Sequence, residues 1–228
     1  MNTGKERISV IIPALNEQDS IGRVINDIPK NMVGEIIVVD NGSIDNTAGI
    51  AQSAGARMVR EPRRGYGAAC LKGIESANHP DIIVFLDGDY SDYPEEMEQL
   101  IEPIMQGRAD LVIGSRTLGS GGEKVLLPQA YWGNKLATWL IYLLYHHRYT
   151  DLGPFRAIRF MALQKLNMQD KNFGWTVEMQ IKAVRNRLAI MEIPVKYRQR
   201  IGTSKITGTV AGTIKAGAKI IYTILSYR

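Results

Sequence analysis

The stretch of sequence that decides the fold runs from Ile82 to Asp89 and reads IIVFLDGD. Its five leading residues are branched or aromatic, which is typical of a strand buried on both faces of a parallel sheet. The apolar run ends in two carboxylates, Asp87 and Asp89, on either side of Gly88. Open α/β sheets bind ligands at the carboxyl ends of their strands. Because hard oxygen ligands suit Mg²⁺ or Mn²⁺, we expect these acids to hold such a cation against the phosphates of a nucleotide substrate.

Two other interpretations of this acidic segment remain open. Asp87, Asp89, Ser91 and Glu98 match four ligand positions of an EF-hand calcium loop. The match fails at Asp92, where the loop requires glycine, and a strand pattern precedes the segment where an EF-hand has a helix. A solvated acidic turn is the other alternative. Catalytic metal binding is the interpretation that we favour.

The composition is that of an ordinary globular protein. The 228 residues are 45% hydrophobic and 22% charged, which suits one large α/β domain or a domain with a small extension. The single cysteine, Cys70, excludes an internal disulfide framework and fits a reducing compartment. Residues 1–7 are polar and charged, so we expect no secretory signal and a cytoplasmic protein. The net charge of +5 favours anionic partners, such as sugar nucleotides, lipid phosphates, a membrane surface or nucleic acid.

Strand and helix patterns alternate through the first half of the chain. Strand patterns lie at 8–12, 35–39, 56–59, 82–86 and 111–114, and helix patterns lie at 17–28, from 45 or 46 to 54, at 65–77 and from 94 onward. This order predicts a doubly wound α/β sheet that is mainly parallel, with helices on both faces and right-handed crossovers.

The second half of the chain is less regular. Helix patterns lie at about 129–146 and 175–186, and strand patterns lie at 155–160 and 189–192. The glycine-rich run at 119–123 predicts a flexible loop or lid. Two apolar stretches, 136–145 and 207–225, are too short or too interrupted by Lys, Gly and Thr to span a membrane. We expect them either to lie on a membrane surface or to pack on the core as ordinary amphipathic helices.

Five motifs follow one another along the chain. They are VIIPALNE at 10–17, VVDNGSID at 38–45, DGD at 87–89, GSR at 114–116 and GTSK at 202–205. In this order they resemble the family 2 inverting glycosyltransferases of the GT-A fold, in the group of dolichyl-phosphate mannose and polyprenyl-phosphate glucose synthases. The resemblance covers Val10 to Lys205. It implies one domain over residues 1–228, with a nucleotide-sugar-binding half up to about 117 and an acceptor-side half from about 118.

The resemblance implies where the nucleotide lies. Pro13, Leu15 and Glu17, at the end of the first strand, would contact the base and ribose of the donor. Asp40, at the end of the second strand, would hold the edge of the base. Each acid also has a structural interpretation, because Glu17 suits the start of a helix and Asp40 suits an Asx turn that leads to Gly42.

The resemblance also implies the metal site. It makes Asp89 a direct ligand and brings Asp87 and Gly88 into contact with the nucleotide sugar, with Asp87 in the predicted metal set as well. In related enzymes a further contact comes two residues after the second Asp, which here is Ser91. Serine is a weaker ligand than the Gln of many dolichyl-phosphate mannose synthases, so Asp92 is an alternative. The metal would neutralise the departing diphosphate.

Basic residues form two further groups. Arg116 closes the fifth strand and is a candidate for clamping a sugar or acceptor phosphate, which Arg binds in a bidentate manner. By resemblance, Arg200 and Lys205 grip the donor diphosphate, although Arg198 is an alternative to Arg200. A solvated basic surface strand would have the same composition. The turn at 63–67, RRGYG, resembles the basic glycine-containing turn of the family, where backbone N–H groups approach a phosphate.

The acceptor decides which catalytic groups the reaction needs. A lipid phosphate is already an anion and needs no general base, whereas a hydroxyl acceptor needs a carboxylate within hydrogen-bond reach. Asp151 is the base that we predict in the second case, beside Asp89 and Arg116 in the catalytic set. Arg156 and Arg159 are candidates for binding a polyprenyl phosphate. A further pair, Trp175 and Glu178, either lines the sugar pocket or packs structurally.

The leading expectation is transfer of a hexose from a UDP- or GDP-sugar to a polyprenyl phosphate, with Mg²⁺ or Mn²⁺, at the cytoplasmic face of a membrane. The alternatives are transfer to a hydroxyl acceptor with Asp151 as base, and a non-catalytic subunit that binds sugar nucleotides. Nucleic acid is not an expected partner, because no strand face interleaves aromatic and basic residues.

Overall fold

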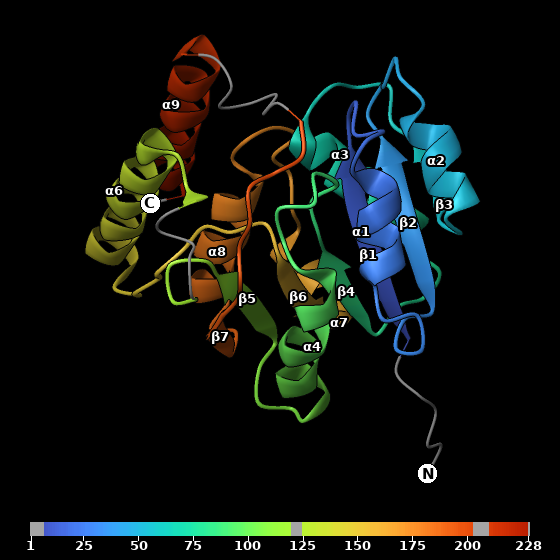
Figure 1. Ribbon diagram of the computed structural model, residues 1–228. Coiled ribbons are helices and arrows are strands. Elements are labelled where there is room, and N and C mark those ends of the chain that lie inside the picture. Colours follow the sequence, from blue (N-terminus) through green and yellow to red (C-terminus); the bar gives the residue numbers. More distant parts are fainter. Residues whose placement is uncertain (1–6, 120–124, 203–209, 228) are drawn as a thin grey trace.

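The computed structural model describes residues 7–119, 125–202 and 210–227. Seven strands form one sheet in the order β3-β2-β1-β4-β6-β5-β7 (Figure 1). The strands are β1 (Ile8–Ala14), β2 (Glu35–Asp40), β3 (Arg57–Arg60), β4 (Ile82–Phe85), β5 (Leu111–Ser115), β6 (Arg156–Arg159) and β7 (Ile190–Pro194). Every neighbouring pair is parallel except those that involve β6, which runs antiparallel between β4 and β5. The predicted fold class, a mainly parallel doubly wound sheet, is confirmed.

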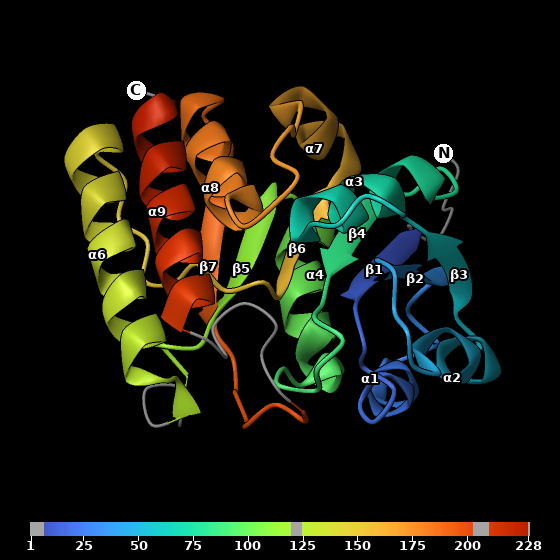
Figure 2. The ribbon, with the colours of Figure 1, turned by 90° about the horizontal axis from the view of Figure 1, so that it is seen from above.

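Helices cover both faces of the sheet, as Figure 2 shows. One face carries α1 (Ile21–Asp27), α2 (Thr47–Ser53) and α4 (Met97–Met105), the last of which follows a 3₁₀ turn at Pro94–Glu96. The other face carries α3 (Tyr66–Ser76), α6 (Pro128–Tyr145), α7 (Phe160–Leu166), α8 (Trp175–Arg185) and α9 (Val210–Ser226).

The alternation of side chains along each strand supplies both cores. In β1, Val10 and Ile12 pack under α1, while Ile11 points to the opposite face and packs under α3. All three are fully buried. A strand with apolar residues on both faces is stable only between two helical layers, which is why these runs read as continuous apolar stretches.

The strand register sets the position of the site. Ala14 at the end of β1 pairs with Asp40 at the end of β2, and Ile11 pairs with Phe85 at the end of β4. The segments that follow these three strands therefore leave the sheet at the same edge. This edge is the one where open α/β sheets bind ligands.

The second half of the chain adds two features that pattern reading missed. The strand expected at 155–160 exists but runs antiparallel, and the short helix α7 follows it directly. The apolar stretches lie on α6 and α9, which pack side by side in parallel orientation at one end of the sheet (Figures 1 and 2). Of the predicted lid at 119–123, residues 120–123 lie outside the described residues.

Among the helices that the structure describes, none combines the length and the apolar character needed to cross a membrane.

Candidate active site

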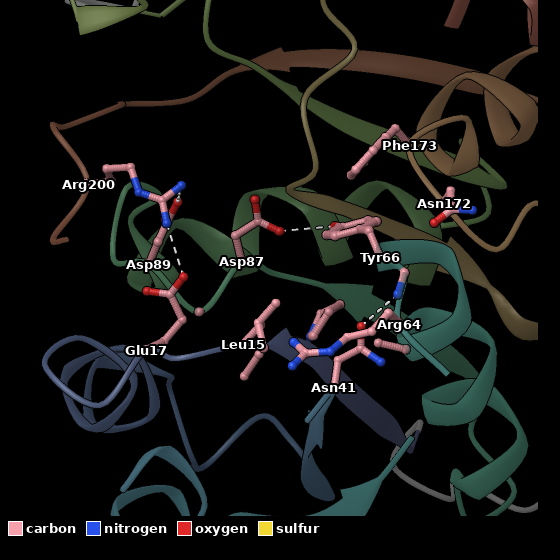
Figure 3. Close-up of a pocket in the computed structure, with 15 residues that line it drawn as sticks. Leu15, Glu17, Asn41, Arg64, Tyr66, Asp87, Asp89, Asn172, Phe173 and Arg200 are labelled. Atoms are coloured by element: carbon pink, nitrogen blue, oxygen red, sulfur yellow. Dashed lines mark hydrogen bonds and ion pairs between the residues drawn. The ribbon is translucent and has the colours of Figure 1, made fainter. Parts of the chain in front are cut away.

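A cavity of about 280 Å³ lies at the carboxyl edge of the sheet, where β1, β2 and β4 end (Figure 3). Its walls include seven of the predicted donor-binding residues, which are Pro13, Leu15, Glu17, Asp87, Gly88, Asp89 and Arg200. Lys205 lies outside the described residues.

The acidic residues of the cavity are tied into a network. The Tyr66 hydroxyl donates to Asp87 Oδ1 at 3.0 Å. Asp89 Oδ1 accepts hydrogen bonds from the backbone N–H and the Oγ of Ser91, at 2.9 and 2.6 Å. The Arg200 guanidinium joins the two sides of the cavity, with Nη1 3.0 Å from Asp89 Oδ2 and Nη2 3.0 Å from Glu17 Oε1 (Figure 3).

Asp87 is harder to ionise in this cavity than an ordinary aspartate. Burial and the negative charge of Asp89 raise the pKa of Asp87 to about 7, against the opposing effects of the Tyr66 hydrogen bond and of Arg200 and Arg116. Burial also raises the pKa of Tyr66 well above its usual value. A buried carboxylate whose ionisation is opposed by burial and by a neighbouring acid is a favourable setting for a cation.

The donor set fits a cation that arrives with its substrate. In the part of the chain that the structure describes, no three His, Cys, Asp or Glu side chains converge to enclose a metal ion. Mg²⁺ and similar ions at phosphate sites are held by one or two carboxylates, with substrate phosphates and water supplying the other ligands. Asp87 and Asp89 meet that requirement. Ser91 does not, because it is buried, does not line the cavity and donates its hydroxyl to Asp89.

The structure corrects the expectation for Asp40. Its Oδ1 accepts the backbone N–H of Ser43 at 2.9 Å, which is the Asx turn, and Asp40 is not part of the cavity wall. The next residue, Asn41, lines the cavity instead. Asn41 Nδ2 donates to the carbonyls of Glu61 and Arg63, and its Oδ1 accepts the Gly65 N–H. The signal that was missed is the amide in the quoted 38–45 motif.

The basic turn at 63–67 owes its position to close backbone packing. A Cβ on Gly67 would lie 2.0 Å from the carbonyl oxygen of Asp170. The Gly67 and Ala68 N–H groups donate to the carbonyls of Asn172 and Lys171. The 170–172 backbone therefore holds the start of α3, and with it Tyr66, against the cavity.

Arg116 and Asp151 form a buried ion pair. Arg116 Nη2 lies 2.7 Å from Asp151 Oδ1, and both Nε and the backbone N–H of Arg116 donate to Oδ2 at 2.8 Å. The Asp151 side chain is 0% exposed. Burial alone would raise the pKa of Asp151, but the Arg116 charge and hydrogen bonds outweigh it and hold the pKa below its usual range.

This pairing does not fit the predicted role of Asp151 as a general base. A base must reach the hydroxyl that it deprotonates and must bind the proton readily. Asp151 has both oxygens occupied, no solvent access and a lowered pKa. The geometry makes it a residue that orients Arg116.

A second cavity, of about 410 Å³, lies between α6 and α9. Tyr66, Asp87 and Phe173 line both cavities, so the two spaces meet beside the acidic segment. Arg116 lies at this end of the second cavity. Apart from Gln129 and Asn134, its helical walls are small or apolar and include Ala130, Gly133, Leu136, Ala137, Ala216, Gly217, Ile220 and Ile221.

Four residues predicted on the acceptor side have structural roles. None of the four lines either of these cavities in the described part of the chain. Arg156 is fully buried and donates to backbone carbonyls, including that of Thr176. Arg159 lies at the opposite edge of the sheet, near Asp110. The other two are Trp175, which packs edge-on against Phe85, and Glu178, which accepts two backbone N–H groups.

The comparisons with known proteins agree with this geometry. Residues 9–166 match the model of the Glycosyl transferase family 2. An uncharacterized glycosyltransferase of Mycobacterium tuberculosis is 32% identical, over 92% of this chain and 94% of that protein. An undecaprenyl-phosphate mannosyltransferase of Micrococcus luteus is 30% identical, over 90% of each.

A solved structure extends the likeness to the fold. Glucosyl-3-phosphoglycerate synthase from Mycobacterium tuberculosis, crystallised with Mn²⁺, uridine diphosphate and phosphoglyceric acid, has a TM-score of 0.80 and 25% identity. The match covers 97% of this chain and 78% of that one. On the strength of its motifs, its strand order and these relatives, the chain belongs to glycosyl transferase family 2.

Proposed function

We propose that the protein transfers a hexose, with inversion, from a UDP- or GDP-sugar to a polyprenyl phosphate, with Mn²⁺ or Mg²⁺ as cofactor. The observation that carries the proposal is the apolar cavity between α6 and α9, which meets the acidic cavity at Tyr66, Asp87 and Phe173. We assign the donor to the first cavity, the donor side, and the acceptor to the second, the acceptor side.

The donor side supplies charge for a diphosphate and its cation. When bound, the cation would neutralise the departing diphosphate, and Asp87 and Asp89 would hold it. Tyr66 fixes the orientation of Asp87 through its hydrogen bond. Arg200 is set between Glu17 and Asp89, and its Nε is buried without a hydrogen-bond partner among the described residues. Arg200 therefore has an unused donor for a phosphate oxygen. A relative that binds Mn²⁺ and uridine diphosphate supports this assignment.

The junction of the cavities is where the sugar would lie. Tyr66 and Phe173 line both spaces, so the sugar between donor and acceptor would meet these two rings. They take the place that the sequence had suggested for Trp175 and Glu178.

The acceptor side suits a phosphate carried on an apolar chain. Arg116 uses Nε and Nη2 on Asp151, which leaves the donors of Nη1 for the acceptor phosphate. The phosphate oxygen is an anion at neutral pH, so the attack needs no general base. That requirement agrees with the inaccessible, ionised Asp151. The apolar walls of α6 and α9 would enclose the first isoprene units of the chain.

The outer surface of the same helices favours a lipid surface as the partner. Trp132, Leu136, Trp139 and Leu143 form one exposed stripe along α6, at spacings of four, three and four residues. Exposed Ile214, Ile221 and Leu225 continue the apolar surface on α9. Leu136 and Ile221 belong both to this surface and to the cavity wall. We therefore propose peripheral binding at the cytoplasmic face, with the cavity opening toward the lipid.

The test is an acceptor comparison. The protein is incubated with radiolabelled UDP- and GDP-hexoses, Mn²⁺ or Mg²⁺, and either a short polyprenyl phosphate or 3-phosphoglycerate. A lipid-extractable labelled product supports the proposal. The absence of lipid-linked product with every donor contradicts it.

A hydroxyl acceptor is the second candidate, and one observation favours it. The solved structure with a TM-score of 0.80 is an enzyme crystallised with phosphoglyceric acid. Labelled product with 3-phosphoglycerate, and none with the lipid, would establish this alternative. Metal-dependent binding of UDP or GDP without transfer to any acceptor would instead indicate the non-catalytic subunit.

A further inference from the structure

Arg198 lies outside both cavities, and its guanidinium lies over two aromatic rings. Its Cζ is 3.3 Å from the ring centroid of Tyr90 and 4.2 Å from that of Tyr93. Of the two arginines that the sequence offered for the donor diphosphate, the structure places Arg200 in the donor cavity and Arg198 here. A planar guanidinium can stack on aromatic faces, whereas the ammonium group of lysine is a compact point charge.

The donors of Arg198 are directed at the backbone that follows the acidic segment. Its Nε donates to the Tyr90 carbonyl at 2.7 Å and its Nη2 to the Asp92 carbonyl at 3.1 Å. Its backbone N–H donates to the Ser91 carbonyl at 2.9 Å. Three successive carbonyls after Asp89 are thus bound to this single residue.

The loop that Arg198 holds has an unfavourable backbone conformation. Tyr90 has a φ of +65°, in the left-handed region that a bulky side chain rarely adopts. Such a conformation persists only where the surroundings impose it. The Tyr90 ring is fixed at both ends, because its hydroxyl donates to Asp27 Oδ2 at 2.6 Å and its face packs on Arg198. Arg198 Nη2 also lies 3.8 Å from the same Asp27 oxygen.

The contact between Arg198 and residues 90–92 also fixes the segment that carries Arg200. The Ile201 N–H donates to the Asp89 carbonyl at 2.9 Å, so bonds at residues 198 and 201 bracket Arg200 on both sides. The positions of Asp89 and Arg200 relative to each other therefore depend on the contact between the two backbones. Arg198 supplies two side-chain hydrogen bonds and two ring contacts to that contact.

We propose that Arg198 is a positioning residue, which sets the geometry of Asp89 and Arg200 without touching the substrate. The inference rests on the proposed function in so far as Asp89 and Arg200 bind the cation and the diphosphate. Lysine cannot replace Arg198, because an ammonium group does not stack flat on an aromatic ring and does not donate to two carbonyls in a fixed fork.

The experiment compares Arg198→Lys with Arg148→Lys. Arg148 also lies over a tyrosine ring, that of Tyr142 at 4.9 Å, but it is exposed and remote from the acidic segment. Mn²⁺ binding in the presence of UDP or GDP is measured by electron paramagnetic resonance, and amide protection is measured by hydrogen exchange. We expect Arg198→Lys to weaken Mn²⁺ binding about 10- to 100-fold, as the loss of a residue that orients a metal ligand typically does. The Ser91 and Ile201 amides should exchange faster, while the KM for the acceptor stays unchanged.

The outcomes separate the two proposals. Unchanged Mn²⁺ affinity and unchanged exchange in Arg198→Lys would overturn the positioning role. So would global unfolding of Arg198→Lys, or an equal effect of Arg148→Lys, because each would indicate a general structural effect. If the wild-type protein binds no Mn²⁺ with either nucleotide, the proposed function fails. The exchange of the Ser91 and Ile201 amides then still decides whether Arg198 positions the loop.

Discussion

The donor side and the acceptor side of the protein differ in the side chains that they present and in how those side chains are paired. On the donor side the polar groups beside the cavity bind one another: Asn41 ties down the 61–65 turn, Tyr66 bonds to Asp87, and Arg200 joins Glu17 to Asp89. On the acceptor side, large apolar side chains remain exposed along two neighbouring helices. Ten of the fourteen strongly exposed large apolar residues in the described chain lie on α6 and α9 or directly before α6.

The difference indicates what each side is built to meet. Polar groups that are hydrogen-bonded to one another are held in position when a small charged ligand enters and takes over some of their bonds. A contiguous stripe of exposed apolar side chains is unfavourable in water. Such a stripe usually marks a surface that binds a membrane or another protein. The predictions that follow test this contrast, from the largest expected effect to the smallest.

The largest effect is expected from the acidic segment of the donor side. Asp89→Asn removes a charge from the cation site while keeping the shape of the side chain. We expect kcat/KM to fall by about 10³-fold, because loss of one electrostatic contact to the leaving group costs about 3–4 kcal/mol. Asp110→Asn, at the opposite edge of the sheet, is the matched control and should retain activity. Equal activity of the two variants would remove Asp89 from the site.

The second prediction concerns the ion pair that joins the two sides. Asp151→Ala leaves the Arg116 charge buried without its partner, and it should lower the free energy of unfolding by about 3–5 kcal/mol. The double variant Arg116→Met/Asp151→Leu should recover most of this loss, because apolar replacements of a buried pair are often neutral. Urea denaturation measures both. An Asp151→Ala variant as stable as the wild type would contradict the buried pairing.

The same pair predicts a sign for the pH dependence of stability. The pKa of Asp151 is lower in the folded protein than its ordinary value of 3.8. The ionised pair therefore stabilises the fold fully above that value, and its contribution is lost as the pH falls through the folded pKa. The double variant should lose less stability than the wild type on acidification in this range. A steeper loss in the double variant would reverse the sign and exclude the pair as its cause.

These residues also show how far the sequence could be interpreted. The acids at 87 and 89 were predictable, because an apolar strand and its end are local features. The choice between Asp40 and Asn41 was not, since the hydrogen bonds that separate them reach residues 43, 61, 63 and 65. Arg116 and Asp151 each drew attention alone, but their pairing depends on a distant loop that returns to β5.

The second half of the fold was harder to predict for the same reason. β6 lies between β4 and β5 and runs antiparallel to both. This placement depends on the whole sheet, and the sequence of residues 155–160 does not indicate it. The acceptor cavity lies between two helices far apart in the chain. Trp175 was ambiguous in sequence, because a buried aromatic residue and a sugar-binding one look alike at helical spacing.

The third prediction tests the surface of α6. Trp132 and Trp139 are 69% and 56% exposed. Replacing both with serine should weaken binding to anionic phospholipid vesicles by about 2 kcal/mol, a factor of about 30, through lost burial of apolar area. Ile44→Ser is the control, since Ile44 is 90% exposed but lies on the donor side. Vesicle sedimentation measures the binding, and equal losses in the two variants would contradict an α6-specific contact.

The smallest effect, and the most selective, is expected from Gly217 in the wall of the acceptor cavity. A Cβ on Gly217 meets no heavy atom within 4 Å, so the backbone accepts a side chain there, and Gly217→Leu should extend into the space between α6 and α9. We expect a KM about tenfold higher for a long polyprenyl phosphate, equivalent to about 1.4 kcal/mol.

The stability of this variant separates obstruction from damage. Leucine favours a helix over glycine by up to about 1 kcal/mol, so Gly217→Leu should unfold no earlier than the wild type. Ala218→Leu, on the exposed face of the same helix, should leave the KM unchanged. The KM of Gly217→Leu for the sugar nucleotide should also remain at the wild-type value, because the donor occupies the other cavity. A rise in the donor KM, or an unchanged KM for the lipid, would mean that the cavity between α6 and α9 does not receive the acceptor chain.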